Sequence, residues 1–364
     1  MKPIPFFDHR AMHDAIRDKL KDAFAQFLSG DLLILGEQVT GFENEFSAYQ
    51  NCAYAVGVNS GLDALILSLK ALQVGHGDEV IVPANTFIAT WNAIHLAGAI
   101  PVPVEPDPLT MNMTAENIRP YLNSRIKAIM PVHLYGLPCP MQEIMDVAHE
   151  HGMYVIEDNA QAVGATADGK KTGSWGHMNA TSFYPTKNLG ALGDGGMVTT
   201  DNAELAAHVK SLRNYGSAKR NISHEIGLNS RLDELQAAFL RIKLNKLDEW
   251  IGERKKIAMH YFEGLKDLEQ LILPATDDNH TYHLFVVRTD ERNALAEHLT
   301  KHQIGSLIHY PIPPHLQEAY GFLKFKPGDF PVTESIADTC LSLPLYYGFD
   351  QEDEVIDCVR SFFL

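Results

Sequence analysis

The side chain best suited to covalent chemistry is that of Lys187, which follows a strand-like run and precedes a glycine-rich loop at residues 190–196. An amine kept neutral by desolvation or by a nearby cation can attack an aldehyde and form a Schiff base. A lysine in a loop is more commonly a solvated surface charge. Lys187 therefore gains a chemical meaning only together with other segments of the chain.

A carboxylate and an amide follow a second strand-like run. Asp158 ends the run 154–157, so we expect it at the carboxyl edge of the sheet, where open α/β folds bind ligands. A carboxylate there can hold the pyridine nitrogen of pyridoxal phosphate (PLP) protonated, which makes the ring an electron sink. The alternative for Asp158 is a helix or turn cap. Gln161 could donate to the phenolic oxygen of the same ring.

Two further segments place an anion site and an aromatic ring near strand ends. Ser60 and Gly61 follow the strand-like run 53–58 and open an apolar helix, so their amides and the Ser60 hydroxyl can bind an anion. A simple serine N-cap is the alternative. Phe87 follows the strand 79–83 and could stack on a pyridine ring, although a core phenylalanine is the commoner fate.

Composition limits the class of protein. The chain has 364 residues, 45% of them hydrophobic, and we expect one large and one smaller domain. A formal charge of −16 leaves no electrostatic footprint for nucleic acid. No signal peptide or run of ~18 apolar residues is present, so we expect a cytoplasmic protein without a membrane partner. The four cysteines are too scattered for a zinc knuckle or disulfide framework, and no metal site is expected.

Short β-branched runs alternate with helical stretches from residue 79 onward, which is typical of an α/β fold with a mostly parallel sheet and crossover helices. We expect about seven strands over residues 50–215 and helices at 86–97, at 141–150 and after residue 200. The prolines of the run 100–104 indicate an edge or a strand end.

The remainder of the chain predicts a second domain. Apolar residues at helical spacing from 232 to about 268 predict one long helix, bent near Gly252. A strand at 283–287, a helix at 292–302, a strand at 305–310 and a helix at 352–362 predict a small α+β domain. We divide the chain into a large domain, 1–245, and a C-terminal domain, 246–364.

Taken in this order, the segments 33–39, 42–46, 59–61, 157–161, 182–187 and 229–238 resemble the DegT/DnrJ/EryC1/StrS family of sugar aminotransferases. These share the type I PLP fold of aspartate aminotransferase, and the resemblance covers nearly the whole chain. It implies the following roles: Lys187 binds PLP covalently, Asp158 pairs with the pyridinium nitrogen, Phe87 stacks on the ring, Gln161 lies near the phenolic oxygen, and Ser60, Gly61 and Ser182 hold the phosphate. It also implies a homodimer with active sites at the subunit interface, where Asn229 and Arg231 reach the partner's cofactor phosphate.

The segment 308–317 resembles the branch of the family that aminates C3 of dTDP-linked 3-keto-6-deoxyhexoses. The expected reaction takes the amino group of L-glutamate, through pyridoxamine phosphate, to such a sugar for a surface polysaccharide, such as a lipopolysaccharide O-antigen, or another glycoconjugate. Candidate sugar contacts are Tyr184, His309, Tyr310 and His315. Candidate contacts of the diphosphate are Arg213, Lys219, Arg220 and Arg231, and a solvated loop face is an equal alternative for Lys219 and Arg220.

Three other functions remain as alternatives. Amination at C4 of a dTDP- or UDP-linked 4-keto sugar is the first. A nicotinamide oxidoreductase is the second, but the glycine-rich loop at 190–196 leads into a strand, whereas a dinucleotide fingerprint leads into a helix. A non-catalytic PLP- or sugar-binding regulator is the third, and a fold alone does not exclude it. Relatives with histidine in place of the lysine deoxygenate their sugar, whereas Lys187 favours transamination.

Overall fold

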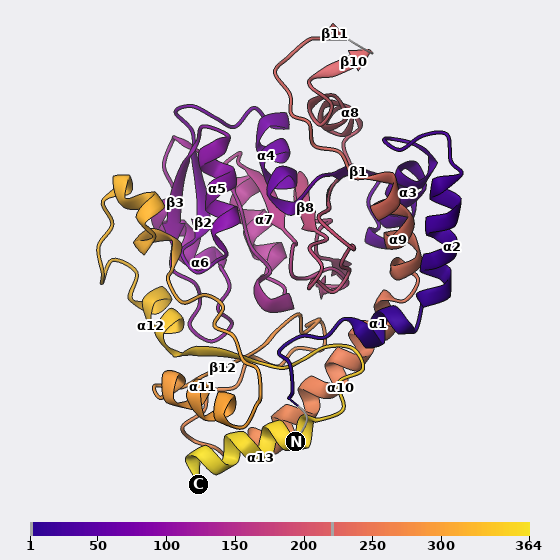
Figure 1. The fold of residues 1–364 in the computed structure, drawn as a ribbon. Helices are drawn as coiled ribbons and strands as arrows, with labels where there is room; N and C mark the ends of the chain where they lie inside the picture. The colour runs from indigo at the N-terminus through magenta and orange to yellow at the C-terminus, as the bar shows by residue number, and fades with distance from the viewer. Residues whose placement is uncertain (1–2, 220–221) are drawn as a thin grey trace.

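The computed structural model describes residues 3–219 and 222–364 of the chain (Figure 1). A seven-stranded sheet has the strand order β1-β9-β8-β5-β4-β2-β3. Strand β9 is antiparallel to both of its neighbours, and the other four pairings are parallel. The strands are β1 (Tyr54–Val58), β2 (Glu79–Pro83), β3 (Ile100–Val104), β4 (Ile126–Ile129), β5 (Tyr154–Asp158), β8 (Met178–Ser182) and β9 (Gly196–Thr200). The predicted α/β fold with a mostly parallel seven-stranded sheet is confirmed, and the proline-containing β3 is an edge strand.

Helices cover both faces of this sheet. Successive residues of a strand point to opposite faces, and apolar residues occur on both of them. Val80 and Val82 pack with α4 (Gly61–Ala71), α5 (Ile88–Leu96) and α8 (Ala203–Leu212). Ile81, between them, packs on the opposite face with α6 (Ala115–Ile118) and α7 (Met141–Glu150). Small hairpins lie outside the sheet, β6 (Thr166–Ala167) with β7 (Lys170–Lys171) and β10 (Ser217–Lys219) with β11 (Ile222–Ser223).

The N-terminal helices α1 (Arg10–Asp14), α2 (Arg17–Leu28) and α3 (Glu37–Gln50) lie beside the sheet near α9 (Glu234–Leu244) (Figure 1). Glu234 holds the start of α3, because its carboxylate accepts the amides of Gly36 at 2.7 Å and of Gln38 and Val39 at 2.9 Å. These are amides that a helix cannot satisfy within itself.

The predicted single helix from 232 to about 268, bent near Gly252, is wrong. Two helices occur instead, α9 and α10 (Leu247–Leu265), and the helix is interrupted at Asn245 and Lys246. Leu247 still packs in the core beside α3, whereas Ile257 belongs to another core, which contains Phe285 and Val287. The change of core occurs within α10, between Ile251, which packs with α9 residues, and Ile257, and Gly252 lies inside this uninterrupted helix.

The predicted strand at 305–310 is also wrong. Strand β12 (Phe285–Arg288) pairs antiparallel with β13 (Cys340–Leu343), which the sequence reading missed, and the segment 305–310 makes only an isolated bridge from Leu307 to Ser342. The prolines that follow the segment cannot donate ladder hydrogen bonds, which limits any pairing there. The other helices of this part of the chain are α11 (Arg292–Lys301), α12 (Pro331–Thr339) and α13 (Glu352–Phe363). Ile4 pairs with Ile304 and joins the same core.

The structure also bears on the predictions about membrane spans and cysteines. No helix among the described residues is both long enough and apolar enough to cross a membrane. All four cysteines are unpaired and buried, as packed thiols would be.

Candidate active site

A cavity of about 720 Å³ lies at the carboxyl edge of the sheet. The parallel strands bring distant segments there, because β5 ends in Asp158 and β8 ends in Ser182. Strand β1 runs in the same direction as β8, since both are antiparallel to β9, so Ser60 reaches this edge too. The predicted site residues that line the cavity are Ser60, Gly61, Phe87, Asp158, Gln161, Ser182, Tyr184, Lys187, His309 and Tyr310.

Lys187 borders the cavity from the turn after β8, where its backbone amide donates to the carbonyl of Tyr184 at 2.9 Å. Burial lowers the pKa of its amine to about 8, and the carboxylate of Asp158 acts in the opposite direction. Two imidazoles share this environment. Burial, and to a smaller extent the charge of Lys187, lowers the pKa of His309 to about 4. The same two causes lower the pKa of His283 well below its ordinary value. Both rings are therefore neutral at neutral pH.

Asp158 is buried, and its carboxylate is held from two directions. Its Oδ2 accepts the hydroxyl of Thr90 at 2.9 Å, and its Oδ1 accepts the amide of Ala160 at 3.1 Å. The hydroxyls of Thr90 and Thr86 are themselves 2.9 Å apart. Burial raises the pKa of Asp158, while these hydrogen bonds and the charge of Lys187 oppose the rise. Thr90 has a role that sequence reasoning missed, because only the fold sets it beside Asp158.

The N-terminus of α4 lies beside Ser182 and forms a potential anion-binding site with it. Ser60 is the N-cap of this 11-residue helix, and its hydroxyl accepts the amide of Asp63 at 3.1 Å. Gly61 lies so close to Ser182 that a Cβ on it would come 2.6 Å from the Cβ of the serine. The absence of a side chain at Gly61 therefore lets the helix N-terminus and the Ser182 hydroxyl converge, in a setting that favours a bound phosphate.

Aromatic rings and an amide form another part of the wall. Phe87 precedes α5, is 50% exposed, and its ring centre lies 5.2 Å from that of Tyr310. Gln161 donates to the Tyr310 hydroxyl at 3.0 Å and accepts the amide of Tyr135 at 2.6 Å. His309 lies 2.8 Å from the hydroxyl of Ser342 through its Nδ1. Residues 309 and 310, from the C-terminal part of the chain, thus contribute directly to the cavity.

The structure does not bring His315 or Arg213 to this cavity. The His315 ring is buried, lies 3.0 Å from Glu334 and packs against Phe330. The buried guanidinium of Arg213 is already paired with Glu43 and donates to the carbonyl of Gly57 at 2.7 Å. Both side chains are committed to structural partners.

Asn229 and Arg231 lie near each other, and neither lines the cavity of this chain. Asn229 is exposed and forms a bridge with Asn214. Arg231 donates to the Asn214 side chain at 3.1 Å and lies over the ring of Tyr215. The side chain of Lys219 and all of Arg220 lie outside the described residues.

The donor set of the cavity fits PLP. The amine of Lys187 suits its aldehyde, the carboxylate of Asp158 suits a protonated ring nitrogen, the N-terminus of α4 suits a phosphate, and the exposed ring of Phe87 suits a planar heterocycle. The buried carboxylate is the strongest sign, since its charge is desolvated without a formal ion pair among the described residues and a ring cation would complete it.

Comparisons with known proteins agree with this arrangement. Residues 14–360 match the model of the DegT/DnrJ/EryC1/StrS aminotransferase family. The chain is 46% identical to the erythromycin biosynthesis sensory transduction protein EryC1 of Saccharopolyspora erythraea, over 98% of this chain and 99% of that protein. It is 45% identical to the dTDP-3-amino-3,4,6-trideoxy-alpha-D-glucose transaminase of Streptomyces venezuelae, over 98% and 96%.

A third relative is the dTDP-3-amino-3,6-dideoxy-alpha-D-galactopyranose transaminase of Aneurinibacillus thermoaerophilus, 46% identical over 99% of both chains. Among solved structures, that of S. venezuelae DesV in complex with a ketimine intermediate has a TM-score of 0.97 and 44% identity. It covers 100% of this chain and 99% of its own.

Proposed function

Because the chain belongs to the DegT/DnrJ/EryC1/StrS aminotransferase family, we propose that it transfers the amino group of L-glutamate to the C3 ketone of a dTDP-linked 3-keto-6-deoxyhexose. The observation that carries the proposal is the cavity that joins Lys187, Asp158 and the N-terminus of α4. The products are 2-oxoglutarate and a dTDP-3-amino-3,6-dideoxyhexose, a precursor for a surface polysaccharide or another glycoconjugate. Two relatives at 45% and 46% identity are named for 3-amino dTDP-sugars, which supports C3 over C4.

The chemistry divides between the cofactor and two side chains. PLP, when bound, supplies an electron sink next to the carbon that loses its proton. The Nζ of Lys187 removes the proton from Cα of the amino donor and later delivers one to the sugar carbon that receives nitrogen. Its pKa of about 8 suits both directions near neutral pH. The carboxylate of Asp158, fixed by Thr90, holds a positive charge on the ring nitrogen.

Three side chains of the cavity support a sugar site next to Lys187. Tyr184 is 53% exposed, and His309 and Tyr310 line the same cavity. His309 is neutral at neutral pH, so it offers one ring nitrogen as a donor or acceptor to a hydroxyl or carbonyl of the sugar. We assign the sugar to these three residues.

A homodimer with active sites at the interface is part of the proposal. Leu32 and Leu33 are 60% and 59% exposed, and Ile34 beside them pairs with Asp233. A partner that covers these apolar side chains would also meet the adjacent Asn229 and Arg231. This supports a role for both residues at the cofactor phosphate of the partner subunit.

The decisive assay is turnover of dTDP-3-keto-6-deoxyhexose with glutamate, measured as 2-oxoglutarate, with the 4-keto isomer as the competing substrate. We expect turnover of the 3-keto sugar and much slower turnover of the isomer. Preference for the 4-keto sugar would move the reaction to C4, and PLP binding without any turnover would make the chain a regulator.

Borohydride reduction of the protein with PLP, followed by peptide mapping, tests whether Lys187 is the residue that binds PLP covalently. Lys243 is a matched internal control, because burial also lowers its pKa to about 8 but its amine donates to the Gly190 carbonyl outside the cavity. Only Lys187 should carry the label. Label on Lys243, or none on Lys187, would remove the assignment.

A further inference from the structure

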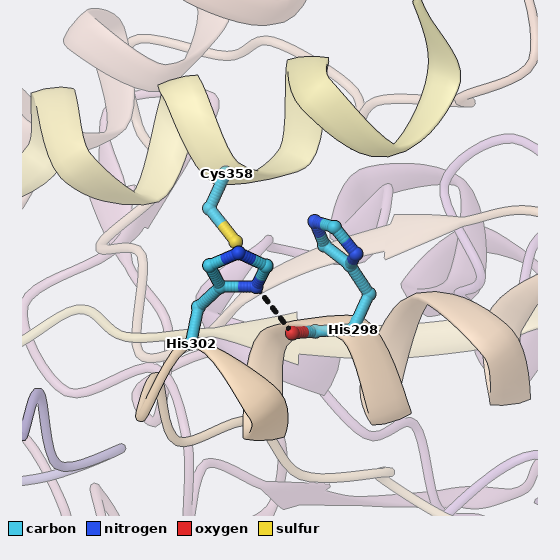
Figure 2. A group of neighbouring side chains, drawn as sticks. All are labelled: His298, His302 and Cys358. Carbon is cyan, nitrogen blue, oxygen red and sulfur yellow. Dashed lines mark hydrogen bonds between the residues drawn. The ribbon is translucent and has the colours of Figure 1, made fainter.

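Three potential metal ligands meet on the outer side of the second domain, away from the cavity. His298 lies on α11, His302 caps the end of that helix, and Cys358 lies on α13 (Figure 2). One ligand atom from each side chain lies within 4.8 Å of the other two. Helices α11 and α13 pack together through Leu295, Leu299, Val355 and Val359, so this meeting is fixed by the core beneath it.

The hydrogen bond of His302 uses Nδ1 and leaves Nε2 free to bind a metal ion. Its Nδ1 is 2.9 Å from the backbone carbonyl of His298, and a carbonyl can only accept, so Nδ1 carries the proton. The lone pair therefore resides on Nε2, the nitrogen that faces Cys358 (Figure 2). A metal-bound histidine commonly donates its second nitrogen to a carbonyl in this way, because the bond fixes the tautomer and the ring orientation.

The side chains of His298 and Cys358 make few hydrogen bonds. Among the described residues, the His298 ring makes one hydrogen bond, from Nε2 to the Ser361 hydroxyl at 3.2 Å, and the Cys358 thiol makes none. The hydrogen of Ser361 goes to the Cys358 carbonyl at 2.8 Å. His302 is exposed, so an ion can reach the group from solvent.

We propose that His298, His302 and Cys358 bind one Zn²⁺ ion, with water as the fourth ligand, and that the ion links α11 to α13. Two imidazoles and a thiolate match the preference of zinc for nitrogen and sulfur ligands. Ligand atoms around tetrahedral zinc are about 3.3–3.7 Å apart, so the three side chains need to close by no more than about 1.5 Å, which rotation about their side-chain bonds supplies. Binding replaces the thiol proton, which passes to water.

The test uses tag-free, PLP-loaded protein that has been treated with a chelator and titrated with Co²⁺ and Zn²⁺. We expect one ion per chain, tetrahedral Co²⁺ absorption to the red of the PLP bands, and a rise of about 3 °C in melting temperature at a hundredfold excess of Zn²⁺ over its Kd. Cys358→Ser should lose the thiolate-to-cobalt absorption, and His302→Gln should weaken binding at least about a hundredfold.

The control is His9→Gln. His9 and His13 form another histidine pair with the same spacing, with ring centres 4.8 Å apart, but without a thiol. This variant should keep the cobalt spectrum and the affinity of the unchanged protein. Equal binding by Cys358→Ser and His302→Gln, an absence of stoichiometric metal, or loss of binding in His9→Gln would overturn the proposal. The exposed position of His302 keeps the test valid if the buried Cys358→Ser variant folds poorly.

Discussion

Replacing Thr90 by valine removes the hydroxyl that Asp158 accepts at 2.9 Å and keeps the volume of the side chain. A hydrogen bond to a charged group contributes about 1.5–3 kcal/mol, and each 1.36 kcal/mol is tenfold in rate. Burial already raises the pKa of Asp158, so the lost donor raises it further and lets the carboxyl keep the proton that the ring nitrogen needs. We expect kcat to fall about 10- to 100-fold, with a smaller change in the KM for glutamate.

The assay is the half reaction with glutamate alone, followed by the change in cofactor absorption in rapid mixing, with melting temperature as the check on folding. Thr90→Ser keeps the hydroxyl and should stay within about threefold of the unchanged enzyme. A valine variant as fast as the unchanged enzyme would refute the reasoning. A serine variant as slow as the valine variant would show that the methyl group, and not the hydroxyl, matters at this position.

Three further outcomes follow from the same geometry. Because burial lowers the pKa of Lys187 to about 8, its neutral fraction grows as pH rises to that value, so covalent capture of PLP by the apoprotein should accelerate about tenfold per pH unit below 8 and level off above, by stopped-flow absorption. Gly61→Ala, whose Cβ would come 2.6 Å from that of Ser182, should weaken PLP binding at least about fivefold in equilibrium titration. Glu157→Gln, which breaks the buried contact with His133, should lower unfolding free energy by about 3 kcal/mol in denaturant titration, while Asp158→Asn should lose activity with a smaller loss of stability.

The elements that the sequence predicted well are those whose buried pattern is local. Strands 79–83 and 196–200 and the helix 141–150 have the predicted bounds, because both faces of each strand are buried and the helix has a strong apolar stripe. The positions of Ser60, Asp158 and Ser182 follow from one further step, since the ends of strands that run in the same direction meet at one edge of the sheet.

The errors arise where a distant partner decides the structure. The helix break falls at Asn245 and Lys246, where no glycine or proline marks it in the sequence. The pairing of β12 depends on β13, more than 50 residues later along the chain. The sequence makes Arg213 a candidate contact of the nucleotide diphosphate, because an acidic protein needs local cations to bind one. Its partner, Glu43, is 170 residues away, so no local pattern could indicate that the charge is already neutralised.

The cavity itself depends on a contact of this distant kind. His283 lines it and comes from the segment that leads into β12. That segment is bonded to the loop after β4, because Thr281 donates to the Gly136 carbonyl at 3.0 Å and Leu284 donates to that of Tyr135 at 3.2 Å. At Gly136, φ is +101° and a Cβ would come 2.6 Å from the Thr281 hydroxyl, so only glycine allows this approach. A division of the chain at residue 246 would therefore pass through this cavity. One half of the cavity is built from strand ends at the sheet edge, and the other half depends on the contact at Gly136.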